Sequence, residues 1–345
     1  MTRRDLLARL APAAAAGLAA GSGIAQPYET PYKCGTLVLG PSHLDGEFDN
    51  RSVDCPFVFR HNGQFYMAYV GWDGIGYQTG LASSTDLLHW KRLGCILKRD
   101  PASQTARYNI AMNWILRENR LRGSGELIRV NGRFLGAYHA YPNAGYEQGP
   151  AVIGLCRSDD LMSWRLDPPC LHPGDGASWE RGGLYKPCLV KMGGAFHLFY
   201  NAKTQEPSGW HEQIGVATSR DLETWTRYHG NPIVPNGGPG SWDEKFASDP
   251  CVLNDGDTWV FFYYGLDGKG RARDLVAAGP DVFHPKKIDR ILIDVGPPGS
   301  VDETYAHKPS VIWHEGMLYH FYCAVSGKWP NETRGISVAR SKPWP

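Results

Sequence analysis

The chain of 345 residues has almost no net charge, because 36 Lys and Arg residues balance 35 Asp and Glu residues. Proteins that bind nucleic acid or anionic membranes carry a basic excess, so neither partner is expected. The chain also lacks a nucleotide-binding glycine motif, the His-Glu-x-x-His motif of metalloproteases and a serine elbow. Its eight cysteines include no Cys-x-x-Cys pair of the kind that binds zinc. We therefore predict no catalytic metal site and no required cofactor.

The apolar stretch near the N-terminus is too short to span a bilayer comfortably. It follows the paired Arg3 and Arg4 and ends at small residues around Ala25, which is the pattern of a twin-arginine signal peptide. We expect residues 1–26 to be this signal peptide and residues 27–345 to form one domain. Export would place the mature protein in the periplasm or outside the cell, without membrane contact after cleavage. The sequence carries no signal of the oligomeric state.

What the chain has in abundance is a repeat, punctuated by 41 glycines and rich in aromatic residues. Each unit begins with an ionisable residue, usually beside a proline, and continues with an apolar run, a glycine turn and an aromatic strand. Most units end in an Asp-Leu turn and a tryptophan. Units of about 60 residues with four antiparallel strands are typical of propeller blades, and a closed ring leaves no exposed sheet edge. The predicted fold is all-β, a five-bladed β-propeller with four antiparallel strands per blade. The unit starts are Asp54, Glu126, Lys186, Asp249 and Lys308.

The first strand of a propeller blade lines the central channel, so these five residues are predicted to converge near one channel mouth. Buried ionisable groups are costly and cluster at functional sites. The alternative is that acids and lysines simply pair in a structural network. The alignment of Glu126 is the weakest, because its unit lacks the proline.

The run Val-Asp-Cys-Pro-Phe-Val-Phe-Arg-His-Asn-Gly-Gln-Phe-Tyr-Met-Ala-Tyr at 53–69, with the Asp-Leu and Trp blade endings, resembles the five-bladed propeller glycosidases. These are glycoside hydrolase family 43 and its relatives in families 32, 62, 117 and 130, and the resemblance covers roughly residues 40–344. It implies a hydrolase of oligo- or polysaccharides. The family pattern implies a base Asp on the first blade, matched by Asp54, and a pKa-tuning Asp on the second, near Glu126. The family's acid Glu on the third blade is replaced here by Lys186, which indicates a divergent member.

Glycoside hydrolysis needs a proton donor and a group that activates water or attacks the sugar carbon. Asp54 is the predicted general base, and the reaction is predicted to invert the anomeric centre. Three residues are candidates for the donor or for tuning its pKa: Glu126, Asp249 and His307. A Glu in an apolar channel retains its proton near neutral pH, and a His titrates there. The sequence leaves the choice open.

Several further residues are predicted to bind the substrate. Lys186 and Lys308 would neutralise carboxylates, bind an anionic sugar or bind phosphate. Trp114 and Trp210 are candidate platforms for a sugar ring, and the alternative for each is a packing role. Glu303 is a candidate rim contact, with a turn that bonds backbone amides as the alternative. Carboxylates and carbonyls at the channel would also suit a structural calcium or sodium ion.

Two other functions fit the same sequence. Lys186 in place of the acid would also mark a carbohydrate-binding propeller without catalysis, and paired lysines would suit a glycoside phosphorylase. The identity of the sugar, its linkage and exo or endo action are not indicated by any motif.

Overall fold

The computed structural model describes residues 26–345 except 207–208 and 329, so the predicted signal peptide lies almost wholly outside the described residues. This part of the chain is nearly all β-structure, with three short 3-10 turns and no α-helix. The turns are η1 (Gln26–Tyr28), η2 (Pro173–Asp175) and η3 (Ser178–Glu180). No helix in the described ranges is long and apolar enough to cross a membrane. The prediction of an all-β chain is confirmed.

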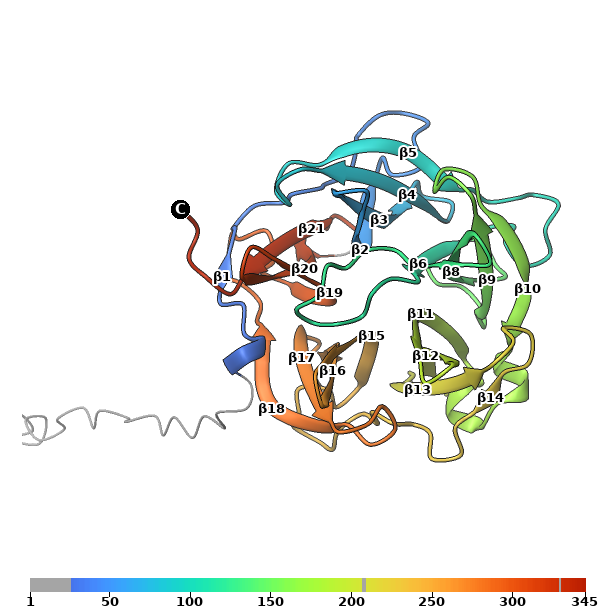
Figure 1. The fold of residues 1–345 in the computed structure, drawn as a ribbon. Helices are drawn as coiled ribbons and strands as arrows, with labels where there is room; N and C mark the ends of the chain where they lie inside the picture. The colour runs from blue at the N-terminus through green and yellow to red at the C-terminus, as the bar shows by residue number, and fades with distance from the viewer. Residues whose placement is uncertain (1–25, 207–208, 329) are drawn as a thin grey trace, which may run out of the picture.

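The strands follow one another as antiparallel groups arranged around a central axis (Figure 1). The first group contains β2 (Ser52–His61), β3 (Gln64–Trp72), β4 (Tyr77–Ser84) and β5 (Lys91–Leu97). The second contains β6 (Ala111–Ile115), β7 (Arg129–Val130), β8 (Arg133–Ala140), β9 (Val152–Ser158) and β10 (Arg165–Leu171). The third contains β11 (Gly183–Met192), β12 (Ala195–Lys203), β13 (Glu212–Ser219) and β14 (Thr226–Arg227).

The fourth group contains β15 (Phe246–Asp255), β16 (Thr258–Leu266), β17 (Ala272–Gly279) and β18 (Lys286–Ile293). The last contains β19 (Tyr305–His314), β20 (Met317–Ser326) and β21 (Thr333–Arg340), and β1 (Tyr32–Lys33) adds to β21. This pairing joins the start of the described residues to their end in one sheet. Lys33 Nζ strengthens the junction by donating to Asp302 Oδ2 at 2.6 Å.

The innermost strands β2, β6, β11, β15 and β19 surround the axis, and each contacts its neighbours around the ring (Figure 1). Their side chains are buried on both faces, which explains why their sequences are continuous apolar runs rather than alternating ones. Polar residues on such strands stand out, because they are enclosed by the core on all sides.

The repeated Ser-x-Asp-Leu sequence forms a turn that the first group shows in full. Ser84 Oγ accepts the backbone N–H of Leu87 at 2.9 Å, and Asp86 Oδ1 accepts those of Leu88 and His89 at 2.9 and 2.8 Å. Trp90 Nε1 then donates to the Leu87 carbonyl at 3.2 Å. The short polar side chains thus replace backbone partners, as they commonly do in turns. The same bonds recur at Ser158–Trp164 and Ser219–Trp225.

One end of the central axis is closed by the segment between β6 and β7, which crosses the middle of the ring (Figure 1). Its Arg117 is only 2% exposed and donates to the Val58 carbonyl at 2.6 Å and the Val311 carbonyl at 2.8 Å. The guanidinium therefore fastens the segment to β2 and β19. Access to the polar residues of the inner strands is left to the other end.

Candidate active site

Every inner strand carries a break in register at the same place, between Asp54 and Phe57 in β2 and at the matching points of β6, β11, β15 and β19. In four of these strands the residue at the break has a left-handed backbone and precedes a proline. The φ angles are +52° at Cys55, +53° at Lys186, +56° at Asp249 and +68° at Lys308. Such a conformation is strained for residues other than glycine and is concentrated at functional sites.

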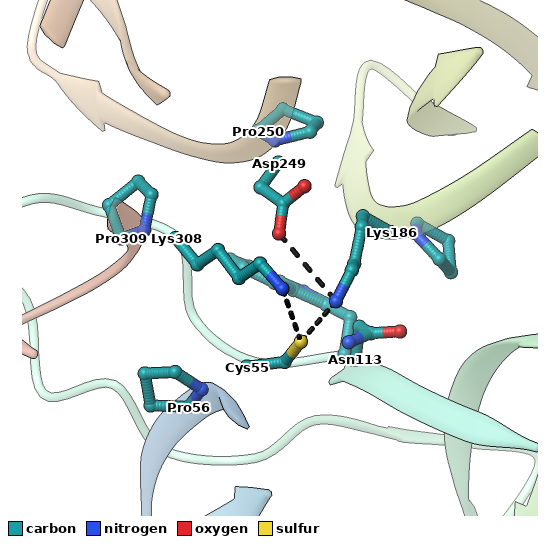
Figure 2. A pocket seen from close by; sticks show the side chains of 10 residues that line it. Cys55, Pro56, Asn113, Lys186, Asp249, Pro250, Lys308 and Pro309 are labelled. Atoms are coloured by element: carbon teal, nitrogen blue, oxygen red, sulfur yellow. Dashed lines mark hydrogen bonds and ion pairs between the residues drawn. The ribbon is translucent and has the colours of Figure 1, made fainter. Parts of the chain in front are cut away.

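These bulges point their side chains into one narrow central cavity of about 30 Å³ (Figure 2). Room of this size suits one or two water molecules and is too small for a sugar. The residues that face it from the five inner strands are Cys55, Asn113, Lys186, Asp249 and Lys308. We call this set the bulge ring.

The bulge ring corrects two positions in the predicted alignment. The first unit contributes Cys55 to the ring, and Asp54 lies one residue earlier. The second unit contributes Asn113 of β6, and the placement of Glu126 at this level is wrong. Glu126 forms a parallel bridge with Arg60, at the other end of β2, which puts it roughly 20 Å along the strand from Asp54. The missing proline in this unit was the signal of the misalignment.

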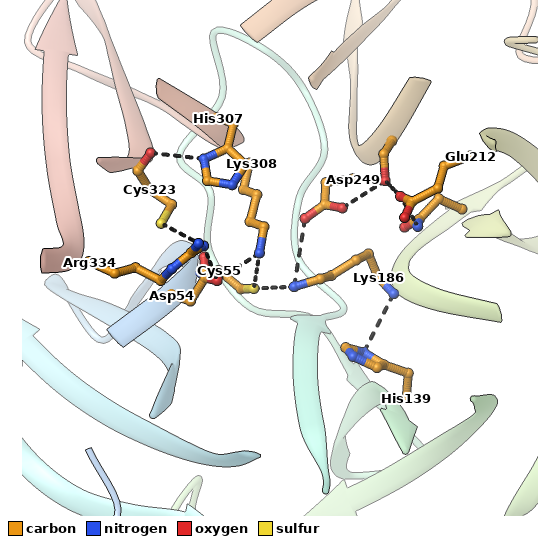
Figure 3. A network of polar contacts seen from close by, with 12 residues as sticks. Asp54, Cys55, His139, Lys186, Glu212, Asp249, His307, Lys308, Cys323 and Arg334 are labelled. Carbon is orange, nitrogen blue, oxygen red and sulfur yellow. Dashed lines mark hydrogen bonds and ion pairs between the residues drawn. The ribbon is translucent and has the colours of Figure 1, made fainter. Parts of the chain in front are cut away.

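Asp54 lies beside the ring in a cationic clamp (Figure 3). Its Oδ2 accepts from Lys308 Nζ at 2.7 Å and Arg334 Nη1 at 3.0 Å, and its Oδ1 accepts the backbone N–H of Cys55 at 2.8 Å. Burial alone would raise the pKa of Asp54, but the charges of Lys308, Arg334 and Lys186 outweigh it and hold the pKa well below its usual value. A carboxylate in this state binds two cations firmly and has little affinity for a proton.

The other side of the ring holds Asp249 and Lys186, whose charged atoms lie 3.7 Å apart. Lys186 Nζ also contacts the thiol of Cys55, and burial and the Asp54 charge raise the pKa of that thiol to about 11. Cys55 is therefore a neutral thiol between two ammonium groups. Lys186 and Lys308 place two positive charges at the cavity, which disfavours the calcium or sodium ion considered from the sequence. The described residues contain no group of three or more His, Cys, Asp or Glu side chains that could hold a metal ion.

Glu212, at the start of β13, is the buried acid that the sequence prediction overlooked. It is 4% exposed, and its Oε1 accepts from Trp210 Nε1 at 2.9 Å. Its Oε2 accepts from Ser248 Oγ at 2.7 Å and Asn201 Nδ2 at 3.2 Å. Burial, and then the negative charge of Glu147, raise the pKa of Glu212 to about 7. This carboxyl therefore holds a proton at a higher pH than an ordinary glutamate does.

Ser248 connects Glu212 to the bulge ring. Its Oγ lies 2.7 Å from Glu212 and 3.0 Å from Asp249 Oδ1, yet a hydroxyl has only one hydrogen to donate. Both contacts are hydrogen bonds only when one of the two carboxyls is protonated and donates to Ser248. Burial also raises the pKa of Asp249, although Lys186 opposes it. The geometry therefore fits one proton held within the row Glu212, Ser248 and Asp249.

Glu147 lies on the loop between β8 and β9 with a left-handed φ of +52°. It lines two cavities of about 190 Å³ and 400 Å³, which also share Tyr146 and Trp210 and so form one cleft. The smaller cavity adds Glu212, Tyr264, His307, Lys308 and Arg334 to its lining. Glu147 and Glu212 thus line a polar, aromatic pocket of about the size of one sugar ring. Hydrolysis of a glycosidic bond uses a pair of carboxyl groups beside that bond.

The remaining predicted residues are dispersed. His307 lines the smaller cavity, and its Nδ1 lies 3.2 Å from the Cys323 carbonyl; burial, Lys308 and Arg334 hold its pKa well below the usual value. Trp210 lines both cavities, whereas Trp114 is buried in β6 rather than on a loop. The Glu303 carboxylate accepts the backbone N–H groups of Gly299 and Gly327 at 2.6 and 3.0 Å. This is the turn bonding that was the alternative for Glu303.

The sequence profile described as "Glycosyl hydrolases family 43" matches residues 127–344, which is more than half of the sequence. The protein is a member of this family. The resemblance to the propeller glycosidases that the sequence indicated is confirmed.

Solved and curated proteins are similar to this protein and support the family assignment. A solved structure described as a BT0996 RGII complex is 32% identical, superposes with a TM-score of 0.81, and is matched over 93% of this protein and 94% of its own length. The levanase of Bacillus subtilis is 31% identical over 36% of this protein and 20% of its own length. "Uncharacterized protein MT1551" of Mycobacterium tuberculosis is 29% identical over 52% of this protein and 60% of its own length. The matches thus span three fifths or less of these curated relatives. The solved relatives of the glycosidase are β-propellers.

Proposed function

We propose that this glycosidase hydrolyses a glycosidic bond at the mouth of a five-bladed propeller, between Glu212 and Glu147. The strand groups around the axis support the five blades, four strands to a blade. The observation that carries the proposal is the buried Glu212, whose pKa is raised to about 7 in part by Glu147. A carboxyl with its pKa raised in this way keeps its proton near neutral pH, as the proton donor of glycoside hydrolysis must.

In this mechanism the sugar that will be released occupies the cavity of about 190 Å³, and Glu212 protonates the leaving oxygen. Glu147 is only partly buried, so water can reach it, and it acts as the base that directs water to the anomeric carbon. This retains the predicted inversion and moves the base from Asp54 to Glu147. Asp54 instead holds Lys308 and Arg334 at the floor of the cavity.

A screen of nitrophenyl glycosides and oligosaccharides tests the proposal, with RGII-derived sugars included because the solved relative is described as an RGII complex. Product analysis by proton NMR at early times is expected to show the inverted anomer first. Release of the retained anomer would assign Glu147 as a nucleophile and contradict inversion. Export is a separate proposal, supported by the Arg3-Arg4 pattern alone, and cell fractionation of the full-length protein tests it.

The rate should depend on pH through Glu212. The protonated form of Glu212 is the active one, so kcat/KM is expected to fall as the pH rises through about 7. A profile from pH 4 to 9 measures this. A rate that rises steadily through pH 7 would rule out Glu212 as the donor.

Replacing Ser248 by Ala removes a donor that favours the ionised form of Glu212. The pKa of Glu212 should rise further, so the alkaline fall of kcat/KM should shift to higher pH by about half a unit or more, the size expected for one hydrogen bond. Ser310→Ala is a matched control, because Ser310 is also buried but its Oγ accepts the N–H of Val58 in another part of the ring. An unchanged alkaline limb in Ser248→Ala would separate Ser248 from the donor.

A further inference from the structure

The cations around the cleft fall into two sets. Those of the smaller cavity already have anionic partners: Lys308 and Arg334 bind Asp54, and Arg334 also binds Glu332 at 2.9 Å. Lys203, on the wall of the larger cavity, has no carboxylate partner within ion-pair distance among the described residues. It is a cation of this cleft that is available to a ligand.

Lys203 lies at the end of β12, directly opposite Glu212 of the neighbouring strand β13. Its ammonium group rests over three aromatic rings, at 4.9 Å from the centroid of Trp210, 5.3 Å from Tyr185 and 5.8 Å from Tyr141. The rings hold the charge by cation–π attraction but accept none of its hydrogen bonds in the usual way. The N–H groups of Lys203 thus remain ready for an acceptor next to the reacting bond.

The two tyrosines beneath Lys203 have hydroxyl groups that also lack a partner in the described part of the chain. The hydroxyls of Tyr141 and Tyr185 are buried, at 1% and 2% residue exposure, and have no hydrogen-bond partner among the described residues. Buried polar atoms are nearly always paired, by protein, water or ligand. Arg181 lines the same cavity and adds a second positive charge. Glu206 also lines this cavity. Its carboxylate lies 3.6 Å from the His211 ring.

We propose that the cavity of about 400 Å³ binds an acidic sugar, with its carboxylate on Lys203, on the leaving side of the bond that is cleaved. This rests on the proposed function, because the cleaved bond is placed at Glu147 and Trp210, which line both cavities. Charge-assisted hydrogen bonds to a carboxylate are about twice as strong as neutral ones, and an aromatic wall accepts the apolar face of the sugar ring. The substrate class is then an oligosaccharide in which a uronic acid follows the sugar that is released.

Isothermal titration calorimetry with digalacturonic acid and with its methyl ester tests the binding directly, without need of turnover. The wild-type protein is expected to bind the acid at least about tenfold more tightly than the ester, as one hydrogen bond to a charged group implies. Lys203→Met should abolish this preference, and Lys203→Arg should retain most of it. Lys191→Met is the matched control, because Lys191 Nζ also lies over an aromatic ring, 5.3 Å from the Phe196 centroid, but outside the cleft.

Equal affinity for acid and ester, absence of binding by both, or a preference that survives in Lys203→Met would overturn the proposal. Inorganic phosphate is titrated separately. Phosphate binding that depends on Lys203, together with no preference for the acid, would assign the cation to a phosphate co-substrate and also overturn it. Hydrolysis of a neutral nitrophenyl glycoside by wild type and by Glu212→Gln reports on the proposed function alone, so the two failures are distinguishable.

Discussion

Glu212→Gln is expected to lower kcat about a thousandfold on a substrate with a poor leaving group, the middle of the range for loss of a general acid. Gln matches Glu in shape and keeps an oxygen for Trp210 Nε1, but it has no proton to give to the leaving oxygen. On a nitrophenyl glycoside, whose leaving group needs less help, the loss should be clearly smaller. The comparison of kcat for the two substrates measures the proton-donor role specifically.

Glu206→Gln is the matched control for this substitution, because Glu206 lines the same cleft but is paired with His211 at its rim. Its kcat should remain within a few-fold of wild type. If Glu212→Gln lost the same factor on both leaving groups, Glu212 would be a base, a nucleophile or a structural residue. Thermal unfolding of the variant separates the last of these from the others.

Asp54→Asn is expected to lower the free energy of unfolding by about 3–5 kcal/mol, as is usual when one partner of a buried ion pair is removed. Lys308 and Arg334 would keep their charges at 6% residue exposure each, without the carboxylate that both bind. Denaturant unfolding followed by tryptophan fluorescence measures the loss. The double variant Asp54→Asn, Lys308→Met should recover part of it, because one of the unpaired charges is gone.

Asp159→Asn provides the comparison at the surface, where Asp159 and Arg133 are 3.2 Å apart and largely exposed. Exposed pairs contribute between 0 and about 1 kcal/mol, so little change is expected. A stable Asp54→Asn protein that has lost turnover would instead support the general base that the sequence suggested for this position.

The repeat predicted much of the architecture because each of its parts has a local physical cause. The Ser-x-Asp-Leu turns satisfy their own backbone, and the continuous apolar runs are the strands buried on both faces. The inward turn at Lys186, Asp249 and Lys308 was readable from the ionisable residue before each proline. The pattern did not predict the bulge in the inner strands. In the first unit this bulge places Cys55, rather than Asp54, at the cavity.

The proposed catalytic pair was harder to find, because it lies outside the repeated positions. Glu147 is on a loop whose course depends on packing between distant segments, and no local motif fixes it. Glu212 did carry a signal, since β13 starts with this acid where β4 starts with Tyr77 and β17 with Ala272. Its raised pKa follows from burial and from Glu147, which only the assembled ring brings near.

A crystal structure of Glu212→Gln soaked with the oligosaccharide that the wild type cleaves tests the central claim most directly. The released sugar should fill the cavity lined by Tyr264 and His307, with the glycosidic oxygen within hydrogen-bond distance of the residue at 212 and the anomeric carbon facing Glu147. A substrate whose scissile bond lies against Asp54, or far from both glutamates, would contradict the account.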